Sequence, residues 1–299
     1  MKMTERSDRF SEIKNRLCEL AKKDVNIWAL IAIGSSTRSE VPADEFSNLD
    51  LFIVTEDPDP WFSGEYPKKL GKVSISFLEP TLGGGKERRC IFDEDKDVDM
   101  VVLTPDQFET AVREGIAGWV MNRGYRILYD AGYMEGKCGS SLPDMLKKYV
   151  SPATAGEAIS ETDYLNLVND FYFHNIWACK KLLRGELWSA KMCIDAYLKR
   201  HLLHMIEQYQ LAQGSEDVWH DGRFLDRWAD HEVREELKDC FAHYDSKDCG
   251  AALMATHKLF AKIAPVVAEK LMIDYPREAE HCAYDYLSRN LGRILDTGN

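Results

Sequence analysis

The sequence predicts an α+β protein, with a mixed α/β domain in residues 1–150 followed by a helical bundle in residues 151–299. Three observations support this prediction. Short apolar runs of strand length alternate with turns in the first half of the chain. Past Gly139 these runs disappear, and long amphipathic segments take their place. An apolar share of 45% over 299 residues is enough to give each half a core of its own.

The first half opens with a helix and continues mainly as strands. An apolar repeat at helical spacing from Phe10 to Leu20 predicts the helix. The acidic turn at 93–97 separates two apolar runs and favours a β-hairpin. Proline is tolerated in the first turn of a helix, so a helix is expected from Pro105. The expected strands are Ile27–Ile33, Leu49–Val54, Val73–Leu78, Arg89–Phe92 and Val98–Leu103, with Tyr125–Tyr129 as a further candidate.

The second half is expected to be helical, because its apolar residues recur at the spacing of packed helices. Aromatic residues share this spacing, and we expect them in the core. These aromatic residues are Tyr172, Phe173, Trp177 and Trp188. The expected helices cover residues 158–184, 186–211, 231–243, 247–273 and 277–296.

Composition narrows the class of function. A formal net charge of −12 argues against a nucleic-acid partner, whose phosphates attract clustered Lys and Arg, and favours a cationic small molecule. No apolar run approaches the ~20 residues that span a bilayer, and the first residues lack the apolar section of a signal peptide. We therefore expect a soluble cytoplasmic protein without a membrane partner. The eight cysteines are scattered, which indicates reduced structural thiols, and the oligomeric state is left open.

The stretch from Ile31 to Val54, IAIGSSTRSEVPADEFSNLDLFIV, carries the candidate chemistry. Its first apolar run ends at Gly34-Ser35, where glycine allows close approach and backbone N–H groups can face a phosphate. Taken alone, Gly-Ser is a weak signal and favours a simple turn that ends a strand. Twelve residues then separate Ser35 from Asn48, and Asn48 and Asp50 share one face of the next strand because strand side chains alternate.

A second pair of acids lies on a later strand. Asp97 and Asp99 share one face of the run DVDMVVL. Carboxylates at the starts of adjacent strands, beside a phosphate-binding turn, are what a Mg²⁺–nucleotide site needs. Mg²⁺ takes hard oxygen ligands and keeps the phosphates of the substrate in its shell.

These features together resemble the signature of the nucleotidyltransferase superfamily typified by DNA polymerase beta. The chain more closely resembles the aminoglycoside 6-adenylyltransferases, also called streptomycin adenylyltransferases. The resemblance covers nearly the whole chain. Its segments are AKKDVNIWALIAIGSSTRSEVPADEFSNLDLFIVTED, IFDEDKDVDMVVLTP, LVNDFYFHNIWACKKLLRGE, AKMCIDAYLKRHLLHMI, DGRFLDRW and LMIDYPREAEHCAYDYL.

The resemblance implies a polymerase-beta-like nucleotidyltransferase domain with a mixed sheet, followed by a helical domain that binds the acceptor. It implies transfer of AMP from Mg-ATP to a hydroxyl of streptomycin or a related aminoglycoside, with release of pyrophosphate. By this resemblance Ser35 holds the β- and γ-phosphates, Asp50 and Asp99 hold the metal ions, and the acceptor lies between the domains. The implied nucleotide-binding residues are Gly34, Ser35, Ser36 and Arg38.

The chain departs from the family pattern at two positions. Asn48 stands where the first acid of the pair is usual, so this position keeps an oxygen ligand but loses a charge. Ser36 stands where Arg is usual, and Arg38 is the nearest cation along the chain. Both changes weaken the electrostatic attraction for Mg-ATP. Asp97 is the nearest acid that could compensate, and its alternative role is that of a solvated residue in the hairpin turn.

Two acids in the helical half are candidates for the proton acceptor of the reacting hydroxyl. Asp170 lies in LVNDFYF, where the family usually carries Glu, and Asp195 lies in CIDAYL, where the family also carries Asp. Each is surrounded by apolar residues, where an unpaired acid is costly. The alternative for both is a carboxylate paired within its own helices.

Three functions remain open from the sequence. The first is an active adenylyltransferase that acts on streptomycin or a related aminocyclitol. The second is a catalytically weakened relative, marked by Asn48, that binds a nucleotide or a cationic ligand. The third is an active nucleotidyltransferase with a different acceptor.

Overall fold

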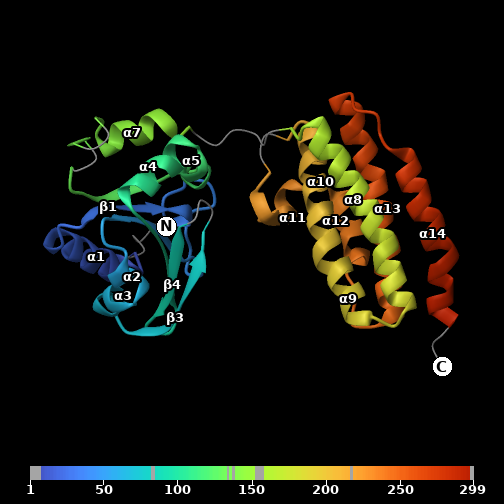
Figure 1. The fold of residues 1–299 in the computed structure, drawn as a ribbon, viewed down its shortest axis with the longest axis horizontal. Helices are drawn as coiled ribbons and strands as arrows, with labels where there is room; N and C mark the ends of the chain where they lie inside the picture. The colour runs from blue at the N-terminus through green and yellow to red at the C-terminus, as the bar shows by residue number, and fades with distance from the viewer. Residues whose placement is uncertain are drawn as a thin grey trace, which may run out of the picture. The chain divides into compact units, whose positions relative to one another are not determined.

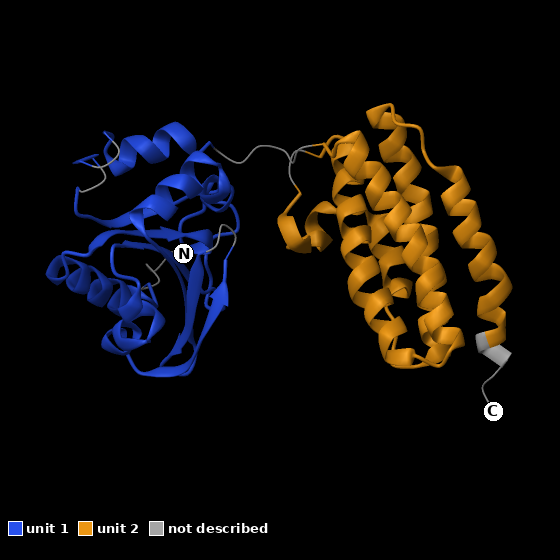
Figure 2. Cartoon of the chain, in the orientation of Figure 1, with its two compact units in different colours: residues 1–153 blue, residues 154–299 orange. Residues whose placement is uncertain are grey.

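The chain divides into two compact units, Met1–Ala153 and Thr154–Asn299 (Figure 2). The computed structural model describes residues 8–81, 85–132, 135–136, 139–151, 158–215 and 218–296. The division falls between residues 153 and 154, where the sequence predicted a boundary near residue 150. Each unit has hydrophobic core clusters of its own.

Unit 1 is built on a six-stranded mixed sheet with the order β3-β4-β5-β2-β1-β6. The strands are β1 (Ile27–Ile33), β2 (Leu49–Thr55), β3 (Val73–Pro80), β4 (Lys86–Phe92), β5 (Lys96–Leu103) and β6 (Arg126–Asp130). Strands β2 and β5 are parallel, whereas the other neighbouring pairs are antiparallel. The sheet therefore confirms the predicted α+β class, and the β4–β5 hairpin confirms the predicted acidic turn.

Helices cover both faces of this sheet (Figure 1). They are α1 (Ser11–Lys23), α2 (Asp59–Phe62), α3 (Glu65–Leu70), α4 (Pro105–Arg113), α5 (Ile116–Met121) and α7 (Leu142–Tyr149). One core cluster joins the sheet to α1, α2 and α3, and another joins its opposite face to α4, α5 and α7. The helix predicted from Pro105 is present, and Thr104 and Gln107 form a capping box at its start.

Unit 2 is helical (Figure 1). Its elements are α8 (Glu161–Leu183), α9 (Leu187–Met192), the π turn η2 (Cys193–Tyr197), α10 (Leu198–Ala212), η3 (His220–Gly222), α11 (Leu225–Trp228), α12 (His231–Leu237), η4 (Lys238–Cys240), α13 (Ser246–Leu271) and α14 (Arg277–Asp296). Its core is aromatic at the centre, where Phe171 and Phe260 stack with ring centroids 3.7 Å apart. Within the described residues, α13 alone is long and apolar enough to cross a bilayer, yet its apolar residues belong to this core.

The structure corrects two expectations for the helical half. The segment 186–211 was expected as one regular helix, and it is helical from Leu187 to Ala212 but contains a π turn at Cys193–Tyr197 between α9 and α10. The aromatic residues do not share one environment either. Tyr172 is buried as expected, whereas Phe173 and Trp188 are 64% and 69% exposed. Spacing places these side chains on a helix but does not say which face of the helix is covered.

Candidate active site

The turn after β1 has a geometry that only glycine permits. Gly34 has a φ of +68°, in the left-handed region, and opens the short 3₁₀ turn Gly34–Ser36. A Cβ atom at this position would lie 2.3 Å from Oδ2 of Asp50. The turn and the Asp50 carboxylate are therefore in direct contact, and any side chain at residue 34 would push them apart.

Hydroxyl groups hold this turn in place. Oγ1 of Thr37 is 3.0 Å from the carbonyl oxygen of Gly34 and 2.8 Å from that of Gly124, which precedes β6. The hydroxyl of Ser36 donates to the carbonyl of Ile33 at 3.2 Å. The hydroxyl of Ser35, in contrast, is buried and has no hydrogen-bond partner within the described part of the chain. A buried hydroxyl costs free energy when it is unpaired, so Ser35 is suited to pair with a bound oxyanion.

Asp50 and Asp99 lie side by side at the centre of the sheet. They are register partners on the parallel strands β2 and β5, so both carboxylates project from the same face. The side-chain nitrogen of Asn48 donates to Oδ1 of Asp50 at 2.7 Å and to Oδ2 of Asp99 at 3.0 Å. The amide therefore joins the two carboxylates. Its nitrogen must face them, because a carboxylate only accepts hydrogen bonds.

An arginine extends this row of charges toward the edge of the sheet. Arg89 on β4 is the register partner of Asp99, and its Nε lies 3.8 Å from Oδ1 of Asp99. The same Nε lies 3.2 Å from Glu79 and 3.3 Å from Glu87, which face each other on β3 and β4. Arg89 is thus held among three carboxylates.

Burial changes the pKa values of two of these acids, Asp99 and Glu87. Burial raises the pKa of Asp99, although Arg89 and the hydrogen bond from Asn48 act in the opposite direction. Burial likewise raises the pKa of Glu87, partly offset by Arg89. Both carboxylates therefore favour additional positive charge or hydrogen-bond donors nearby.

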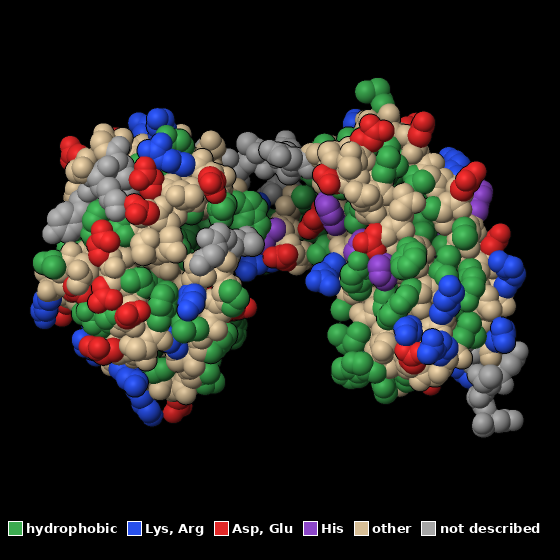
Figure 3. Space-filling model, in the orientation of Figure 1, with side chains coloured by type: hydrophobic (Ala, Val, Ile, Leu, Met, Phe, Trp, Pro, Cys, Tyr) green, Lys and Arg blue, Asp and Glu red, His purple; other side chains and the backbone are tan. Residues whose placement is uncertain are grey.

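A cavity of about 440 Å³ opens beside these acids on the face covered by α4 and α5. Asp50, Asp99 and Glu87 line its polar side, whereas its apolar side includes Phe52 and Trp119. Its size lies within the range of pockets that bind small ligands. Acidic side chains are also spread over the face of unit 1 that Figure 3 shows.

The donor set fits a Mg²⁺ ion whose shell is completed by substrate phosphates. Within the described residues, no cluster of three or more His, Cys, Asp or Glu side chains could hold a metal ion. Asp50 and Asp99 supply hard oxygen atoms, whereas Asn48 turns its nitrogen toward them, and one or two carboxylates with phosphates are the usual ligands of Mg²⁺. These residues therefore suit an ion that arrives with a nucleotide.

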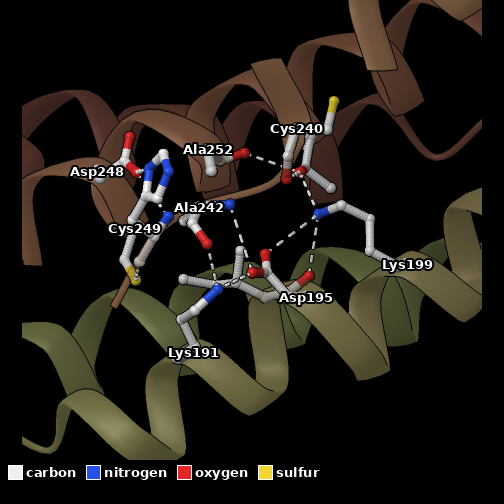
Figure 4. Close-up of polar contacts among 11 residues, drawn as sticks. Lys191, Asp195, Lys199, Cys240, Ala242, Asp248, Cys249 and Ala252 are labelled. Carbon is white, nitrogen blue, oxygen red and sulfur yellow. Dashed lines mark hydrogen bonds and ion pairs between the residues drawn. The ribbon is translucent and has the colours of Figure 1, made fainter. Parts of the chain in front are cut away.

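In unit 2, Asp195 is hydrogen-bonded within the unit at Oδ2, whereas its buried Oδ1 has no hydrogen-bond partner among the described residues (Figure 4). It lies in the π turn, where Lys191 donates to its carboxylate and the N–H of Ala242 donates at 3.3 Å. Lys199 approaches from the other side, with Nζ 4.0 Å from Oδ1 of Asp195, and donates to the hydroxyl of Thr256 at 2.7 Å. Burial lowers the pKa of Lys199 to about 8. This arrangement is that of a structural ion pair.

Asp170 has a more open environment. The hydroxyl of Tyr197 donates to its two oxygens at 2.9 and 3.1 Å, and the carboxylate is 37% exposed. His174 and His201 lie 2.5 and 3.2 Å from the same carboxylate. Burial alone raises the pKa of Asp170, but these partners outweigh it and the pKa is lowered. Asp170 is therefore an ionised carboxylate that faces solvent.

Nearly the whole chain, residues 8–290, matches the streptomycin adenylyltransferase family. The chain belongs to this family. It is similar in structure to an aminoglycoside 6-adenyltransferase from Bacillus subtilis, with 16% identity and a TM-score of 0.44, over 96% of this chain and 99% of that one. It is also similar to a nucleotidyltransferase-like protein from Exiguobacterium sibiricum 255-15, with 14% identity and a TM-score of 0.31, over 95% of this chain and 89% of that one. No curated protein matches the sequence.

The structure of this streptomycin adenylyltransferase family member brings most of the predicted residues of unit 1 together, around Asp50. Arg38 contacts the loop that follows the Gly34 turn. Its Nε donates to the carbonyl of Val41 at 2.7 Å, within a loop where Val41 has a φ of +45°. Asp97 is exposed and does not line the cavity.

Sequence reasoning missed Glu87 and Arg89. The strand was expected to begin at Arg89, whereas β4 begins at Lys86 and includes both residues. Glu87 and Arg89 alternate with the buried side chains Arg88 and Cys90, so a period of two places them on one face. Pairing that face with the strand of Asp99 would have predicted the contact.

Proposed function

We propose that the chain transfers AMP from Mg-ATP to a hydroxyl of streptomycin or a related aminoglycoside and releases pyrophosphate. The acceptor oxygen forms a bond to the α-phosphorus, and the bond from that phosphorus to the pyrophosphate oxygen breaks. The observation that carries the proposal is the contact of the Gly34 turn with Asp50, beside the unpaired hydroxyl of Ser35. A phosphate binds such a turn, and a paired carboxylate site lies next to it.

Each part of unit 1 then has a role. Gly34 lets the nucleotide phosphates approach the backbone, and the hydroxyl of Ser35 donates to a phosphate oxygen. Asp50 and Asp99 hold Mg²⁺, which as a Lewis acid stabilises charge on the reacting phosphate when it is bound. The cavity beside them has room for part of the nucleotide.

For the acceptor we propose Asp170 rather than Asp195. Asp195 already receives hydrogen bonds from Lys191 and the backbone of Ala242, so its charge is compensated within the unit. Asp170 is partly exposed and has a lowered pKa, so it stays ionised and suits binding of a cationic acceptor. The net charge of −12 supports a cationic acceptor and the absence of a nucleic-acid partner.

One observation favours a second function. Asn48 supplies a neutral amide where a third carboxylate would attract the metal ion, and it donates to both acids. A chain with this site can bind a nucleotide or a cationic ligand with little catalysis. An active enzyme with another hydroxyl acceptor is the third possibility. In each case we expect a soluble cytoplasmic protein.

A pyrophosphate-release assay with Mg-ATP and a panel of aminoglycosides tests these functions. The variants are Asn48→Asp, Asp50→Ala and, as a matched control, Asp97→Ala, which removes an exposed acid outside the cavity. Turnover in the wild type and in Asp97→Ala that disappears in Asp50→Ala supports the proposal. Turnover only in Asn48→Asp supports the weakened relative. Turnover absent with every aminoglycoside but present with a cell extract contradicts the proposed acceptor.

A further inference from the structure

We propose that the hydrogen bonds of Asn48 and the positive charge of Arg89 together take the place of a second cation, so that the chain holds one divalent ion in a site of a kind that often holds two. The inference rests on the proposed function, because it concerns the same carboxylates. Sites of this reaction class commonly use two metal ions clamped by carboxylates. Here the protein supplies part of that positive charge from its own side chains.

The amide of Asn48 donates hydrogen bonds to the two carboxylate oxygens that would otherwise bridge a pair of ions. Its nitrogen donates to one oxygen of Asp50 and to one oxygen of Asp99, at 2.7 and 3.0 Å. A carboxylate at this position would add a third negative charge and would repel the other two unless cations lay between them. With asparagine, the two acids are stabilised by hydrogen bonds instead.

Arg89 supplies the positive charge on the other side of Asp99. Its Nε is 3.8 Å from Oδ1 of Asp99, whereas Asn48 contacts Oδ2, so each oxygen of this carboxylate faces a protein donor. The side chain of Arg89 is 42% exposed, and Glu79 and Glu87 lie 3.2 and 3.3 Å from its Nε. These two acids hold the guanidinium beside Asp99.

The two acids consequently differ in what they can offer an ion. Asp99 has a hydrogen bond from Asn48 at one oxygen and an ion pair with Arg89 at the other, while Asp50 has its Oδ2 against the Gly34 turn, where we propose that the phosphates bind. An ion that arrives with the nucleotide can be held by Asp50 and Asp99 together with phosphate oxygens. A second ion on this side would have to displace Arg89, because its guanidinium already lies beside Asp99.

Titration with Mn²⁺ at a saturating concentration of a non-hydrolysable ATP analogue, followed by the electron paramagnetic resonance signal of free Mn²⁺, tests this inference on the full-length protein. We expect one specific site per chain in the wild type and two in the Asn48→Asp/Arg89→Leu double variant. We also expect at least tenfold tighter first-site binding in Asn48→Asp. An Asp50→Asn/Asp99→Asn variant measures non-specific binding to this acidic chain, and that binding is subtracted.

A matched control separates the effect of Arg89 from a general change of charge. Lys86→Leu removes a positive charge from the same strand at a residue whose ammonium lies over Phe62 rather than beside Asp99, and it should leave the site count at one. Circular dichroism of each variant checks that the fold is kept. Two specific sites in the wild type, or none at millimolar Mn²⁺, would overturn the inference. A count of one in the double variant would also overturn it.

The result is independent of the pyrophosphate assay. One Mn²⁺ site without turnover would keep the inference and contradict the proposed function. Turnover with two sites in the wild type would keep the function and contradict the inference.

Discussion

The two units compensate the negative charge of their carboxylates in different ways. In unit 1, Asp50 and Asp99 share a neutral amide, a single arginine approaches one of them, and both acids line a cavity. In unit 2, two lysines surround Asp195 among packed helices. A cluster of acids that faces a cavity with incomplete compensation can bind an incoming cation, whereas an acid neutralised within the fold stabilises that fold. The setting of a carboxylate, more than its presence in a motif, thus separates the two roles.

The largest effect that this comparison predicts is on catalysis. We expect Asp50→Ala to lower kcat by about a hundredfold to a thousandfold, the range for removal of a group that stabilises transition-state charge. The midpoint of thermal unfolding should change little, because Asp50 lies at the edge of a cavity. Steady-state kinetics and thermal unfolding of the same preparation measure both quantities. If Asp50→Ala lowered the midpoint of thermal unfolding markedly as well as kcat, Asp50 would stabilise the fold as Asp195 does, and the contrast between the two units would be wrong.

The opposite pattern is expected for Asp195→Ala. Removal of this acid leaves Lys191 and Lys199 without their carboxylate, and loss of one partner of a partly buried ion pair should cost about 2 kcal/mol, between the values for exposed and buried pairs. Urea unfolding measures the free energy of unfolding. Asp170→Ala is the matched control, since a more exposed acid of the same unit should cost less than about 1 kcal/mol. Similar values for the two variants would show that Asp195 has no special structural role.

Sequence reasoning predicted the architecture well because strand length and helical periodicity are local signals. Strand β1 has the predicted bounds Ile27–Ile33, and the predicted helices of the second half account for α8, α13 and α14. The short helices α2, α3 and α5 were missed, because four to six residues contain too little periodicity to identify a helix.

The site residues that the sequence predicted are those whose pattern lies within one continuous segment of the chain. Gly34 and Asp50 were found because their spacing along the chain is specific, but the contact between Asn48 and Asp99 depends on which strands are neighbours. The same is true of Arg89, whose role appears only when β4 is paired with β5. Asp170 and Asp195 look alike in sequence, since both lie on apolar helical segments. Their difference arises from Lys199 and Tyr197, which pack against one acid each.

A smaller effect concerns the pH dependence of stability in unit 2. Burial lowers the pKa of Lys199 to about 8 from a usual value of 10.5, so between these values the unfolded chain binds more protons than the folded chain. Stability from this residue therefore rises with pH. Between pH 7.5 and 9.5 the wild type should gain about 2 kcal/mol relative to Lys199→Met. Urea unfolding across this range measures the difference, and a constant difference would show that Lys199 stays charged in the fold.

The smallest predicted effect is that of Asp170→Asn on the KM for the acceptor. It tests whether Asp170 of unit 2 serves the acceptor while Asp50 and Asp99 of unit 1 serve the nucleotide. Asp170→Asn keeps the shape of the side chain and removes its charge, so the KM for a cationic acceptor should rise by about tenfold, as expected for one lost charge-assisted hydrogen bond. The KM for ATP should stay unchanged, because Asp170 lies on α8 and the proposed nucleotide site lies wholly in unit 1. Steady-state kinetics with each substrate varied in turn measures both constants.

His201→Gln is the matched control, since it removes a neighbour of Asp170 but keeps the carboxylate and should raise the acceptor KM less. An unchanged acceptor KM in Asp170→Asn would remove Asp170 from the acceptor site, and the difference between the two units would then rest on Asp195 alone.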